Sequence, residues 1–385
     1  MPSTNLCSEP PTAVSPESLE RLAVWLDEAE YVLVGMGAGL SASAGLNYVD
    51  PDFFRRHFPV HAALGLRTVW EAVTGFWDIT PDTRLAYWGY WARHIRVMRY
   101  EPPALPPYVD LARLLRGRDW FIASTNADGQ ARKLGLDEAR IYTPQGDYAL
   151  FQCALPCREQ VYDNRAFVDA MLAPLGEGDT LIREEDVPRC PHCGRFLVPN
   201  LRKDEHFVDA LHREGYPRYR DFLERAAGGR LLLLELGVGF NTPGIIRYPF
   251  EHLTEKFPAV RLARINLTQA AVPPRLGDRA LRHRRGFKAV GGDEQVGKAE
   301  KRSAGNRKNA GRKRYVEAHR RVEVQRVGGR SLQAGKSGTR PSPAGNPACL
   351  RTCHTSSGSG AEYRGHRRLL RFGLVGGCGR QTGVE

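Results

Sequence analysis

Four cysteines in two close pairs carry the most specific chemical signal in this chain. Three residues separate Cys153 from Cys157, and two separate Cys190 from Cys193. In a long chain whose start does not resemble a secretory leader, such pairs favour a metal over disulfides. Four thiolates complete a tetrahedral shell, so we predict a structural zinc ion. Ordinary thiols, His192 as a competing ligand and a zinc ribbon that binds nucleic acid are the alternatives.

A second chemical signal is a run of small residues after a short apolar segment. Residues 35–41 read Gly-Met-Gly-Ala-Gly-Leu-Ser, and residues 42–45 continue with Ala-Ser-Ala-Gly. Glycines let the backbone approach a pyrophosphate, and the amides at a helix start can receive its charge. The spacing differs from GxGxxG, so a dinucleotide site and a tight structural turn both stay open at this point.

Polar side chains that could act on a bound ligand come later in the chain. Asn126 and Asp128 follow the apolar run 120–123, and the pair Gln145-Gly146 comes after them. Taken alone, Asn126 and Asp128 could simply cap the following helix. Gln145-Gly146 is uninformative in isolation, so the meaning of these groups depends on the elements that hold them.

Short apolar strands alternating with helices must position these residues. We predict strands at residues 31–34, 120–123, 231–236 and 260–265. A first helix is predicted to begin at Pro16, behind a Ser15 cap, and to run to Glu30. This alternation is typical of an α/β domain with a parallel sheet. The glycine-rich and polar segments follow the strands, which is where such sheets bind ligands.

Two insertions interrupt the alternation. Residues 50–115 are rich in aromatic side chains and predict a helical insertion with an aromatic core, or alternatively the wall of a substrate channel. The second insertion is the cysteine-bearing module at about residues 150–200. We therefore predict that residues 1–280 form a Rossmann-like parallel sheet with a helical insertion and a small inserted zinc-binding domain.

Charge divides the chain at about residue 280. Residues 281–385 hold 24 Lys and Arg against 7 Asp and Glu, whereas residues 1–280 hold 32 against 36. The net charge of +13 therefore comes from the C-terminal segment, and the mildly acidic body argues against a nucleic-acid-binding domain. We predict that residues 281–385 form a disordered basic tail that could still contact phosphates. The other four cysteines are Cys7, Cys349, Cys353 and Cys378.

Taken together, these segments resemble the sirtuin family over roughly residues 20–275. The family's Gly-Ala-Gly-x-Ser element falls on residues 37–41, and its Asn-x-Asp-Gly element falls on residues 126–129. Its His-Gly pair falls on Gln145-Gly146, just before the four cysteines. A later glycine-bearing strand end spans residues 236–239, and Ile265-Asn266 resembles the family's adenosine contact.

The resemblance implies a Rossmann-like domain and a small zinc-binding domain with NAD between them. It implies catalytic roles for Asn126, Asp128 and Gln145. It also implies NAD contacts from Gly37, Ala38, Gly39, Ser41, Gly237, Val238, Gly239, Asn241 and Asn266.

Three departures from the family pattern resemble class M, the macrodomain-linked branch. Gln145 replaces the histidine, Thr125-Asn126 replaces a Gln-Asn pair, and residues 235–243 replace a Gly-Thr-Ser segment. That branch is associated with ADP-ribosylation of lipoyl-carrier proteins. The resemblance therefore implies an NAD-dependent protein ADP-ribosyltransferase that releases nicotinamide.

The chemistry of Gln145 supports this choice. Deacylation needs a base to activate a ribose hydroxyl, and histidine, with a pKa of about 6.5, suits that role. A glutamine amide cannot take up a proton at neutral pH, although it can hydrogen-bond a hydroxyl. An NAD-dependent deacylase is therefore the second hypothesis. An inactive NAD-binding or partner-binding module is the third, because sirtuins usually continue with further core residues after the strand at Ile265-Asn266.

The expected partners follow from this class. We expect a protein substrate, with a lipoyl-carrier protein as the candidate, and a macrodomain protein as a second candidate partner. Arg202 and Arg247 could contact an anionic substrate, although solvent-exposed arginines are the more ordinary interpretation. The chain lacks a run of about 18 apolar residues, so we expect no membrane association and a cytoplasmic location.

Overall fold

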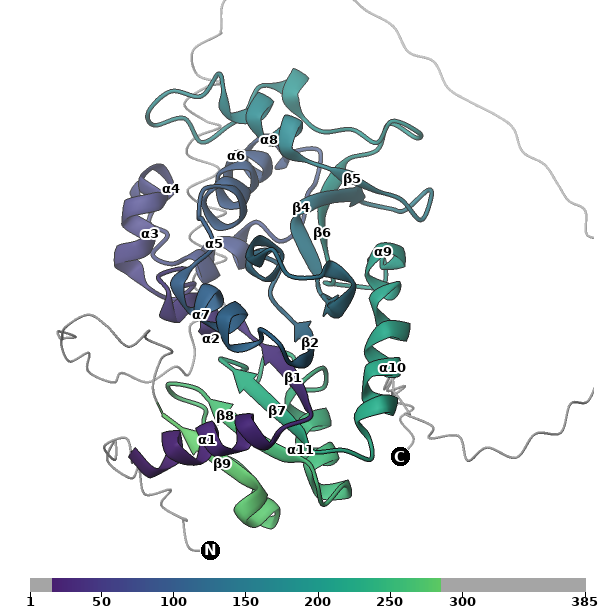
Figure 1. The fold of residues 1–385 in the computed structure, drawn as a ribbon. Helices are drawn as coiled ribbons and strands as arrows, with labels where there is room; N and C mark the ends of the chain where they lie inside the picture. Colours follow the sequence, from purple (N-terminus) through teal and green to yellow (C-terminus); the bar gives the residue numbers. More distant parts are fainter. Residues whose placement is uncertain (1–15, 285–385) are drawn as a thin grey trace, which may run out of the picture. The chain divides into compact units, whose positions relative to one another are not determined.

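The computed structural model describes residues 16–284, which belong to one compact unit (Figure 1). The predicted basic tail beyond residue 284 and the cysteines at positions 7, 349, 353 and 378 lie outside the described residues. Within residues 16–284, no helix is long and apolar enough to cross a membrane.

A six-stranded sheet forms the body of the described chain. In spatial order its strands are β3 (Ile141–Tyr142), β2 (Asp119–Ser124), β1 (Tyr31–Met36), β7 (Leu231–Leu236), β8 (Arg261–Ile265) and β9 (Ala280–His283). Every neighbouring pair is parallel, and the central strands are apolar because both faces are covered. The predicted α/β class and the four predicted strands are therefore confirmed. β9 continues three residues past the boundary predicted at residue 280.

The register of the strands brings the predicted ligand loops to one edge of the sheet. Met36, the last residue of β1, lies opposite Ser124 in β2 and opposite Leu236 in β7. Leu236 in turn lies opposite Ile265, the last residue of β8. The loops after all four strands therefore leave the sheet side by side, at the edge where parallel sheets bind ligands.

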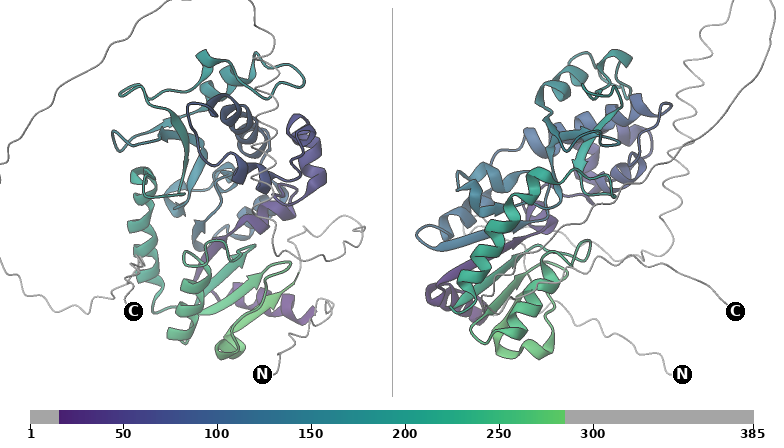
Figure 2. Two further views of the ribbon diagram at one scale, coloured as in Figure 1. Left: turned by 180° about the vertical axis from the view of Figure 1, so that it is seen from behind. Right: turned by 90° about the vertical axis from the view of Figure 1, so that its right-hand side faces the viewer.

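Helices cover both faces of this sheet (Figures 1 and 2). They are α10 (Gly215–Ala226) and α11 (Arg247–Lys256) on one face, and α1 (Pro16–Glu28) and α7 (Pro106–Leu114) on the other. Leu33 of β1 shares a buried cluster with Phe222 and Phe250, whereas its neighbours Val32 and Val34 belong to the cluster on the other face. The alternation follows from the two-residue period of a strand.

The aromatic-rich segment between β1 and β2 is helical, as predicted. It contains α3 (Pro51–His57), α4 (Pro59–Ala63), α5 (Val69–Gly75), α6 (Arg84–Ile95) and the π-helical turn η1 (Arg96–Tyr100). Asp50 and Thr68 cap α3 and α5 with side-chain oxygens. Trp88, Tyr90 and Trp91 of α6 are at most 2% exposed, so the interpretation as an aromatic core is confirmed.

A small antiparallel sheet follows the main sheet's β3 and packs against α6. Its strands are β5 (Val161–Asp163), β4 (Gly146–Cys153) and β6 (Leu197–Leu201). The rings of Trp88 and Phe151 lie 4.7 Å apart, which joins the small sheet to the helical insertion. The remaining elements are α2 (Ala38–Ser43), α8 (Arg165–Leu172), α9 (Ala210–Arg213), η2 (Gln130–Leu134), η3 (Glu138–Arg140), η4 (Glu184–Asp186) and η5 (Pro274–Arg279).

Candidate active site

Two glycine-bearing loops pack against each other at the carboxyl edge of the sheet. Gly37 donates its N–H to the Leu236 carbonyl, and Gly39 donates to the Gly237 carbonyl, both at 3.0 Å. A Cβ atom at Gly37 would lie 2.6 Å from the Gly237 oxygen, and one at Gly39 would lie 2.8 Å from it. Close approach of the loops explains these glycines. Ala38 is exposed beside them, and its contact with NAD stays a prediction.

Ser41, Asn126 and Asp128 come together in one hydrogen-bonded cluster. Ser41 Oγ donates to Asp128 Oδ2 at 2.5 Å. Asn126 Nδ2 donates to the Gly37 carbonyl at 3.1 Å and lies 3.4 Å from Ser41 Oγ. The hydroxyl of Tyr108 lies 2.7 Å from Ser41 Oγ and 3.1 Å from Asn126 Nδ2. Three of the predicted site residues therefore meet, and Tyr108 of α7 joins them.

Asp128 is a buried carboxyl group with dedicated hydrogen-bond donors. Only 4% of the residue is exposed, and burial raises the pKa of its carboxyl group. The Ser41 hydroxyl and the Gln130 N–H, which lies 3.0 Å from Oδ1, oppose that rise. Asp147 raises the pKa further, while the Arg99 guanidinium lowers it. The ionised form of Asp128 therefore depends on these donors.

Arg99 joins the Asp128 loop to the segment that contains Gln145. A Cβ atom at Gly129 would overlap its guanidinium. Arg99 Nε also donates to Asp147 Oδ1 at 2.8 Å, two residues after Gln145. The Gln145 carbonyl accepts the N–H of Arg202, whose side chain is 44% exposed, as expected. The half-buried Gln145 side chain makes no hydrogen bond to the described residues, so its amide is available to a ligand.

The second group of predicted NAD-contacting residues lies beyond β7 and β8. Asn266 Nδ2 donates to the Val238 carbonyl at 2.9 Å, and its Oδ1 accepts two backbone N–H groups of the following turn. A Cβ atom at Gly239 would lie 3.0 Å from Gln269 Oε1, and Asn241 is exposed. Asn266 therefore links the two loops, and its contact with adenosine stays a prediction.

A buried ion network of Glu235, Arg247, Glu251 and Arg264 braces the same loops. Arg264 is fully buried and donates to both carboxylate oxygens of Glu235, at 2.7 and 2.9 Å. Arg264 also lies 2.9 Å from Glu251. Arg247 is 2% exposed and donates to the Val238 carbonyl at 3.2 Å. The interpretation of Arg247 as a solvent-exposed arginine is therefore wrong, because two carboxylates compensate its charge in the interior.

The four paired cysteines converge at one end of the small sheet. Their Sγ atoms all lie within 4.8 Å of one another, with Cys153 to Cys193 and Cys157 to Cys190 at 3.6 Å. Tetrahedral zinc with Zn–S bonds of about 2.3 Å needs sulfur separations of about 3.8 Å. The donor set therefore fits a four-thiolate zinc. His192 is exposed and forms a hydrogen bond of 3.0 Å with a neighbouring glutamine instead.

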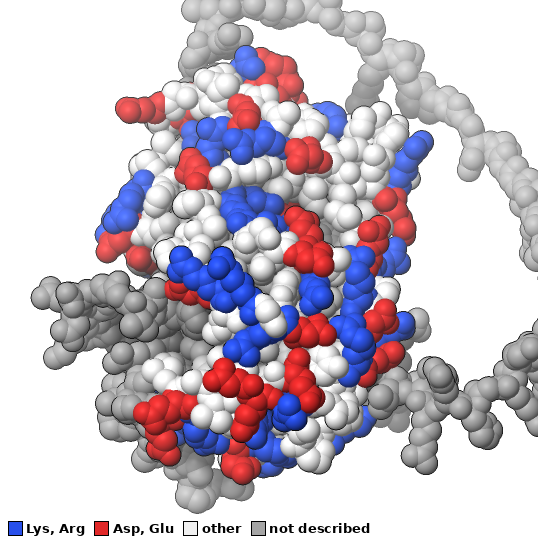
Figure 3. Space-filling model, viewed as in Figure 1, with Lys and Arg blue, Asp and Glu red and all other residues white. Residues whose placement is uncertain are grey.

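Basic and acidic side chains are interspersed over the face of the described chain in Figure 3. Many are paired, for example Arg213 with Glu159 at 3.2 Å and Arg140 with Asp119 at 2.9 Å. Such a surface lacks the stripe of one sign that is typical of phosphate-backbone binding. That the body does not bind nucleic acid stays a prediction.

Comparison with known proteins decides the family. No family model matches the chain. The chain is 30% identical over 274 residues to a protein ADP-ribosyltransferase from Staphylococcus aureus (strain Mu50), which covers 68% of this chain and 82% of that protein. The chain belongs to the family of this protein ADP-ribosyltransferase. It is also 34% identical over 264 residues to a "probable bifunctional ADP-ribose hydrolase/ADP-ribosyltransferase" from Fusarium oxysporum f. sp. cubense, and spans only 44% of that protein.

Solved structures similar to this ADP-ribosyltransferase family member include two Sir2 proteins. A Sir2 bound to acetylated peptide has a TM-score of 0.41 and 16% identity, covering 80% of this chain and 98% of that chain. A second structure, described as "Structural Basis for the Mechanism and Regulation of Sir2 Enzymes", has a TM-score of 0.43 and 16% identity. The match covers 69% of this chain and 92% of that chain.

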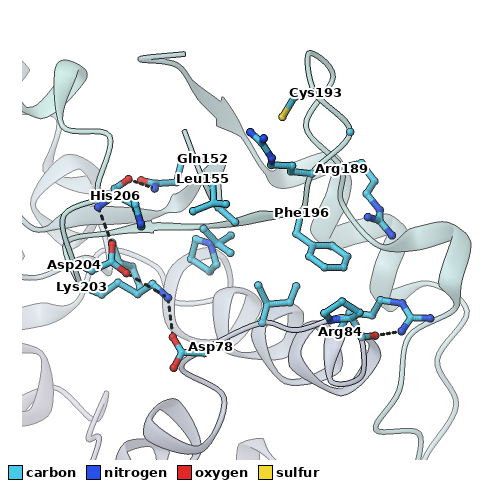
Figure 4. Close-up of a pocket in the computed structure, with 18 of the residues that line it drawn as sticks. Asp78, Arg84, Gln152, Leu155, Arg189, Cys193, Phe196, Lys203, Asp204 and His206 are labelled. Atoms are coloured by element: carbon cyan, nitrogen blue, oxygen red, sulfur yellow. Dashed lines mark hydrogen bonds and ion pairs between the residues drawn. The ribbon is translucent and has the colours of Figure 1, made fainter. Parts of the chain in front are cut away.

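A pocket of about 920 Å³ in this family member lies along β6 (Figure 4). It extends from Cys193 to Lys203, and Arg84 and Asp78 of the helical insertion form its opposite wall. Of the predicted site residues, Cys193 alone lines this pocket. The residues predicted to be catalytic and to contact NAD therefore lie outside this pocket.

Sequence analysis missed Tyr108, Arg99 and the Glu235–Arg264 pair. Tyr108 gave no usable signal, because it is one aromatic residue among many in the helical insertion. The Glu235–Arg264 pair did leave a signal. Each is a charged residue inside a predicted apolar strand, and opposite charges on neighbouring buried strands predict an ion pair.

Proposed function

We propose that this chain is an NAD-dependent protein ADP-ribosyltransferase that releases nicotinamide. The observation that carries the proposal is the cluster in which Ser41 meets Asn126 and Asp128 at the ligand-binding edge of a parallel sheet. The name of the staphylococcal relative supports the same reaction. The sirtuin-like motifs at these positions support NAD as the ADP-ribose donor.

Asn126 and Asp128 are assigned to the cleavage step. The paired glycine loops and Asn266 would hold NAD, which supplies the ADP-ribose group. As the bond to nicotinamide loosens, positive charge develops on the ribose, and oriented groups in a poorly solvated site stabilise it strongly. The buried carboxylate of Asp128 and the amide oxygen of Asn126 are groups of that kind.

Gln145 favours ADP-ribose transfer over deacylation. Its amide has no basic nitrogen, so it cannot activate a ribose hydroxyl by taking up a proton. It can still hydrogen-bond a ribose hydroxyl or orient an incoming nucleophile, since its side chain is half-buried and makes no hydrogen bond to the described residues. In a transfer reaction the acceptor can bring its own nucleophile, so the lack of a base slows transfer less than it slows deacylation.

The cysteine cluster has a structural role in this proposal. Four thiolates saturate a zinc ion and leave no position for substrate or water. Cys153 ends β4, and Gly146 begins the same strand directly after Gln145. Zinc bound at one end of β4 would therefore stabilise the strand that carries Gln145 at its other end.

A protein is the proposed acceptor, and a lipoylated carrier protein is the candidate. The implied link to a macrodomain partner finds support in the fungal relative, whose name combines an ADP-ribose hydrolase with an ADP-ribosyltransferase. This chain spans 44% of that protein, and a macrodomain protein is the proposed partner.

Nicotinamide release and product analysis with three forms of the full chain test the reaction class. Wild type should release nicotinamide and label an acceptor protein, whereas Gln145→Ala should transfer ADP-ribose more slowly. Gln145→His introduces a base and serves as the matched variant for deacylation of an acylated peptide. Wild type that deacylates the peptide as fast as Gln145→His would refute the proposed role of Gln145. Full transfer activity in Gln145→Ala would remove this residue from the mechanism.

A further inference from the structure

Tyr108 lies at the centre of the hydrogen-bonded cluster at the sheet edge. The residue is 1% exposed, and its hydroxyl contacts Ser41 Oγ at 2.7 Å and Asn126 Nδ2 at 3.1 Å. Buried hydroxyl groups are nearly always paired. Here both partners are residues of the candidate active site rather than parts of the core, so the phenol contributes more than packing.

The direction of each hydrogen bond in the cluster follows from the available protons. Ser41 donates its single hydroxyl proton to the Asp128 carboxylate, so Ser41 Oγ must accept the proton of Tyr108. The Tyr108 oxygen in turn accepts an N–H of Asn126. The series of hydrogen bonds therefore runs from Asn126 through Tyr108 and Ser41 to Asp128. Each donor in it has an acceptor when Asp128 is ionised.

This series of hydrogen bonds decides which end of the Asn126 amide faces the site. Nδ2 donates to the Gly37 carbonyl, which can only accept, and to the Tyr108 oxygen. With the nitrogen held by these two acceptors, Oδ1 is the opposite end of the planar amide, and it accepts no hydrogen bond from the described residues. Asn126 is half-buried, so Oδ1 is the end that a ligand meets.

Gln130 fixes the helix that carries Tyr108 relative to the Asp128 loop. Its side chain accepts the Leu105 N–H at 3.0 Å and donates to the Pro103 carbonyl at 3.1 Å, just before α7 begins. Its own N–H donates to Asp128 Oδ1 at 3.0 Å. The Tyr108 phenol and the Asp128 carboxylate are therefore held in one frame.

We propose that Tyr108 is a positioning residue of the proposed reaction, which holds the Asn126 amide with Oδ1 toward the ribose of the ADP-ribose donor. This inference rests on the proposed function for its kinetic consequence, but the orientation of the amide is a property of the free protein. Phenylalanine at position 108 keeps the ring and removes both hydrogen bonds. Asn126 Nδ2 then loses one of its two shortest hydrogen bonds. The amide can therefore adopt other orientations besides the one that presents Oδ1 to the ribose.

Tyr108→Phe is the test variant, and Tyr90→Phe is its matched control. Tyr90 is also fully buried, and its hydroxyl contacts His94 Nδ1 at 3.0 Å within the helical insertion. For Tyr108→Phe we expect kcat of nicotinamide release to fall at least about tenfold, with KM for NAD changed by less than about threefold. Tyr90→Phe should leave kcat unchanged. Equal kcat values for Tyr108→Phe and wild type, or equal losses in both variants, would overturn the proposal.

A double-mutant cycle separates positioning from a general structural role. If Tyr108 acts through Asn126, the variant that combines Tyr108→Phe with Asn126→Ala should be no slower than Asn126→Ala alone. Additive losses would overturn the proposal. If melting curves reveal that Tyr108→Phe is unfolded, Ser41→Ala breaks the same series of hydrogen bonds at its next bond. An unchanged kcat at saturating NAD in that variant would also overturn it.

The orientation of the amide can be tested without turnover. In the ¹⁵N spectrum of the free chain, the side-chain amide signal of Asn126 is identified by its loss in Asn126→Ala. It should exchange slowly with solvent in wild type and Tyr90→Phe, and faster and at a shifted position in Tyr108→Phe. An unmoved signal would overturn the inference. Wild type that releases no nicotinamide would instead refute the proposed function, while this spectrum still decides the role of Tyr108.

Discussion

Replacing Arg264 by methionine tests the buried ion network that braces the loops beyond β7 and β8. Arg264 is fully buried, contacts both carboxylate oxygens of Glu235 and donates to the Ala271 carbonyl at 2.6 Å. Methionine is unbranched and apolar, so much of the packing is kept while Glu235 loses its bidentate partner. Arg247 lies 3.6 Å from Glu235 Oε1 and compensates the carboxylate only in part.

The expected loss of stability is large. Removing one partner of a buried ion pair costs roughly 3–5 kcal/mol. In a chain of this size, 1 kcal/mol changes Tm by roughly 2–4 °C, so we expect Tm to fall by roughly 6–20 °C. Burial already raises the pKa of Glu235, and Arg264 and Arg247 oppose that rise. Without Arg264 the pKa rises further, so the deficit should shrink as pH falls and the folded state takes up a proton on Glu235.

Thermal unfolding of the full chain at pH 7 and pH 5 measures this effect. Arg275→Met is the control, because Arg275 pairs with Glu255 at 3.3 Å with both side chains at least 50% exposed. Such exposed pairs contribute about 0–1 kcal/mol. Adding Glu235→Gln to Arg264→Met should recover part of the loss. A Tm for Arg264→Met within about 2 °C of wild type, or no recovery in the double variant, would refute the reasoning.

Four further predictions concern the loops, the metal and two titrating groups. Gly37→Ala should lower Tm and raise KM for NAD, because its Cβ would lie 2.6 Å from the Gly237 oxygen. Gly228→Ala, with nothing within 4 Å, should do neither, and equal effects would contradict the loop packing. Cys190→Ser or a chelator should remove bound zinc and lower Tm, whereas Cys349→Ser should retain the metal. A zinc-free chain with an unchanged Tm would contradict a structural zinc site. Burial lowers the pKa of His61 to about 3 from 6.5. Below pH 6.5, the contribution of this residue to the free energy of unfolding should therefore fall by up to about 1.4 kcal/mol per pH unit. Urea unfolding of His61→Gln should give a flatter pH dependence, and an unchanged slope would exclude His61 as its source. Burial raises the pKa of Asp128, and Asp147 and Arg99 adjust it in opposite directions. Nicotinamide release should therefore decline on acidification, at a pH above the usual pKa range of aspartate. A pH profile without this acidic decline would contradict a catalytic role for ionised Asp128.

The main sheet and the meeting of its loops could be predicted from the sequence. The strands are short apolar runs, and parallel strands in register bring the segments after residues 36, 124, 236 and 265 to one edge. The cysteine cluster could also be predicted, because tetrahedral zinc needs two close pairs and little else. These features depend on local pattern and on rules that hold for every parallel sheet.

The partners of the site residues could not be predicted in the same way. Tyr108 reaches Ser41 because α7 packs across the sheet edge, and no local pattern fixes that crossing. Arg247 is interpreted from the sequence as exposed because arginine side chains ordinarily are. Its burial depends on carboxylates from β7 and from its own helix meeting in space. Side chains whose role depends on long-range packing therefore become visible only in the folded chain.

The most direct test of the proposed function is the intact mass of a lipoylated carrier protein after incubation with NAD and the full chain. Asn126→Ala provides the matched control, since it removes the amide assigned to the cleavage step and keeps every glycine of the two loops. We predict that the carrier gains the mass of one ADP-ribose with wild type, that nicotinamide is released in equal amount, and that the control produces neither. A carrier that loses an acyl group, or that keeps its mass while the chain leaves NAD intact, would contradict the proposal.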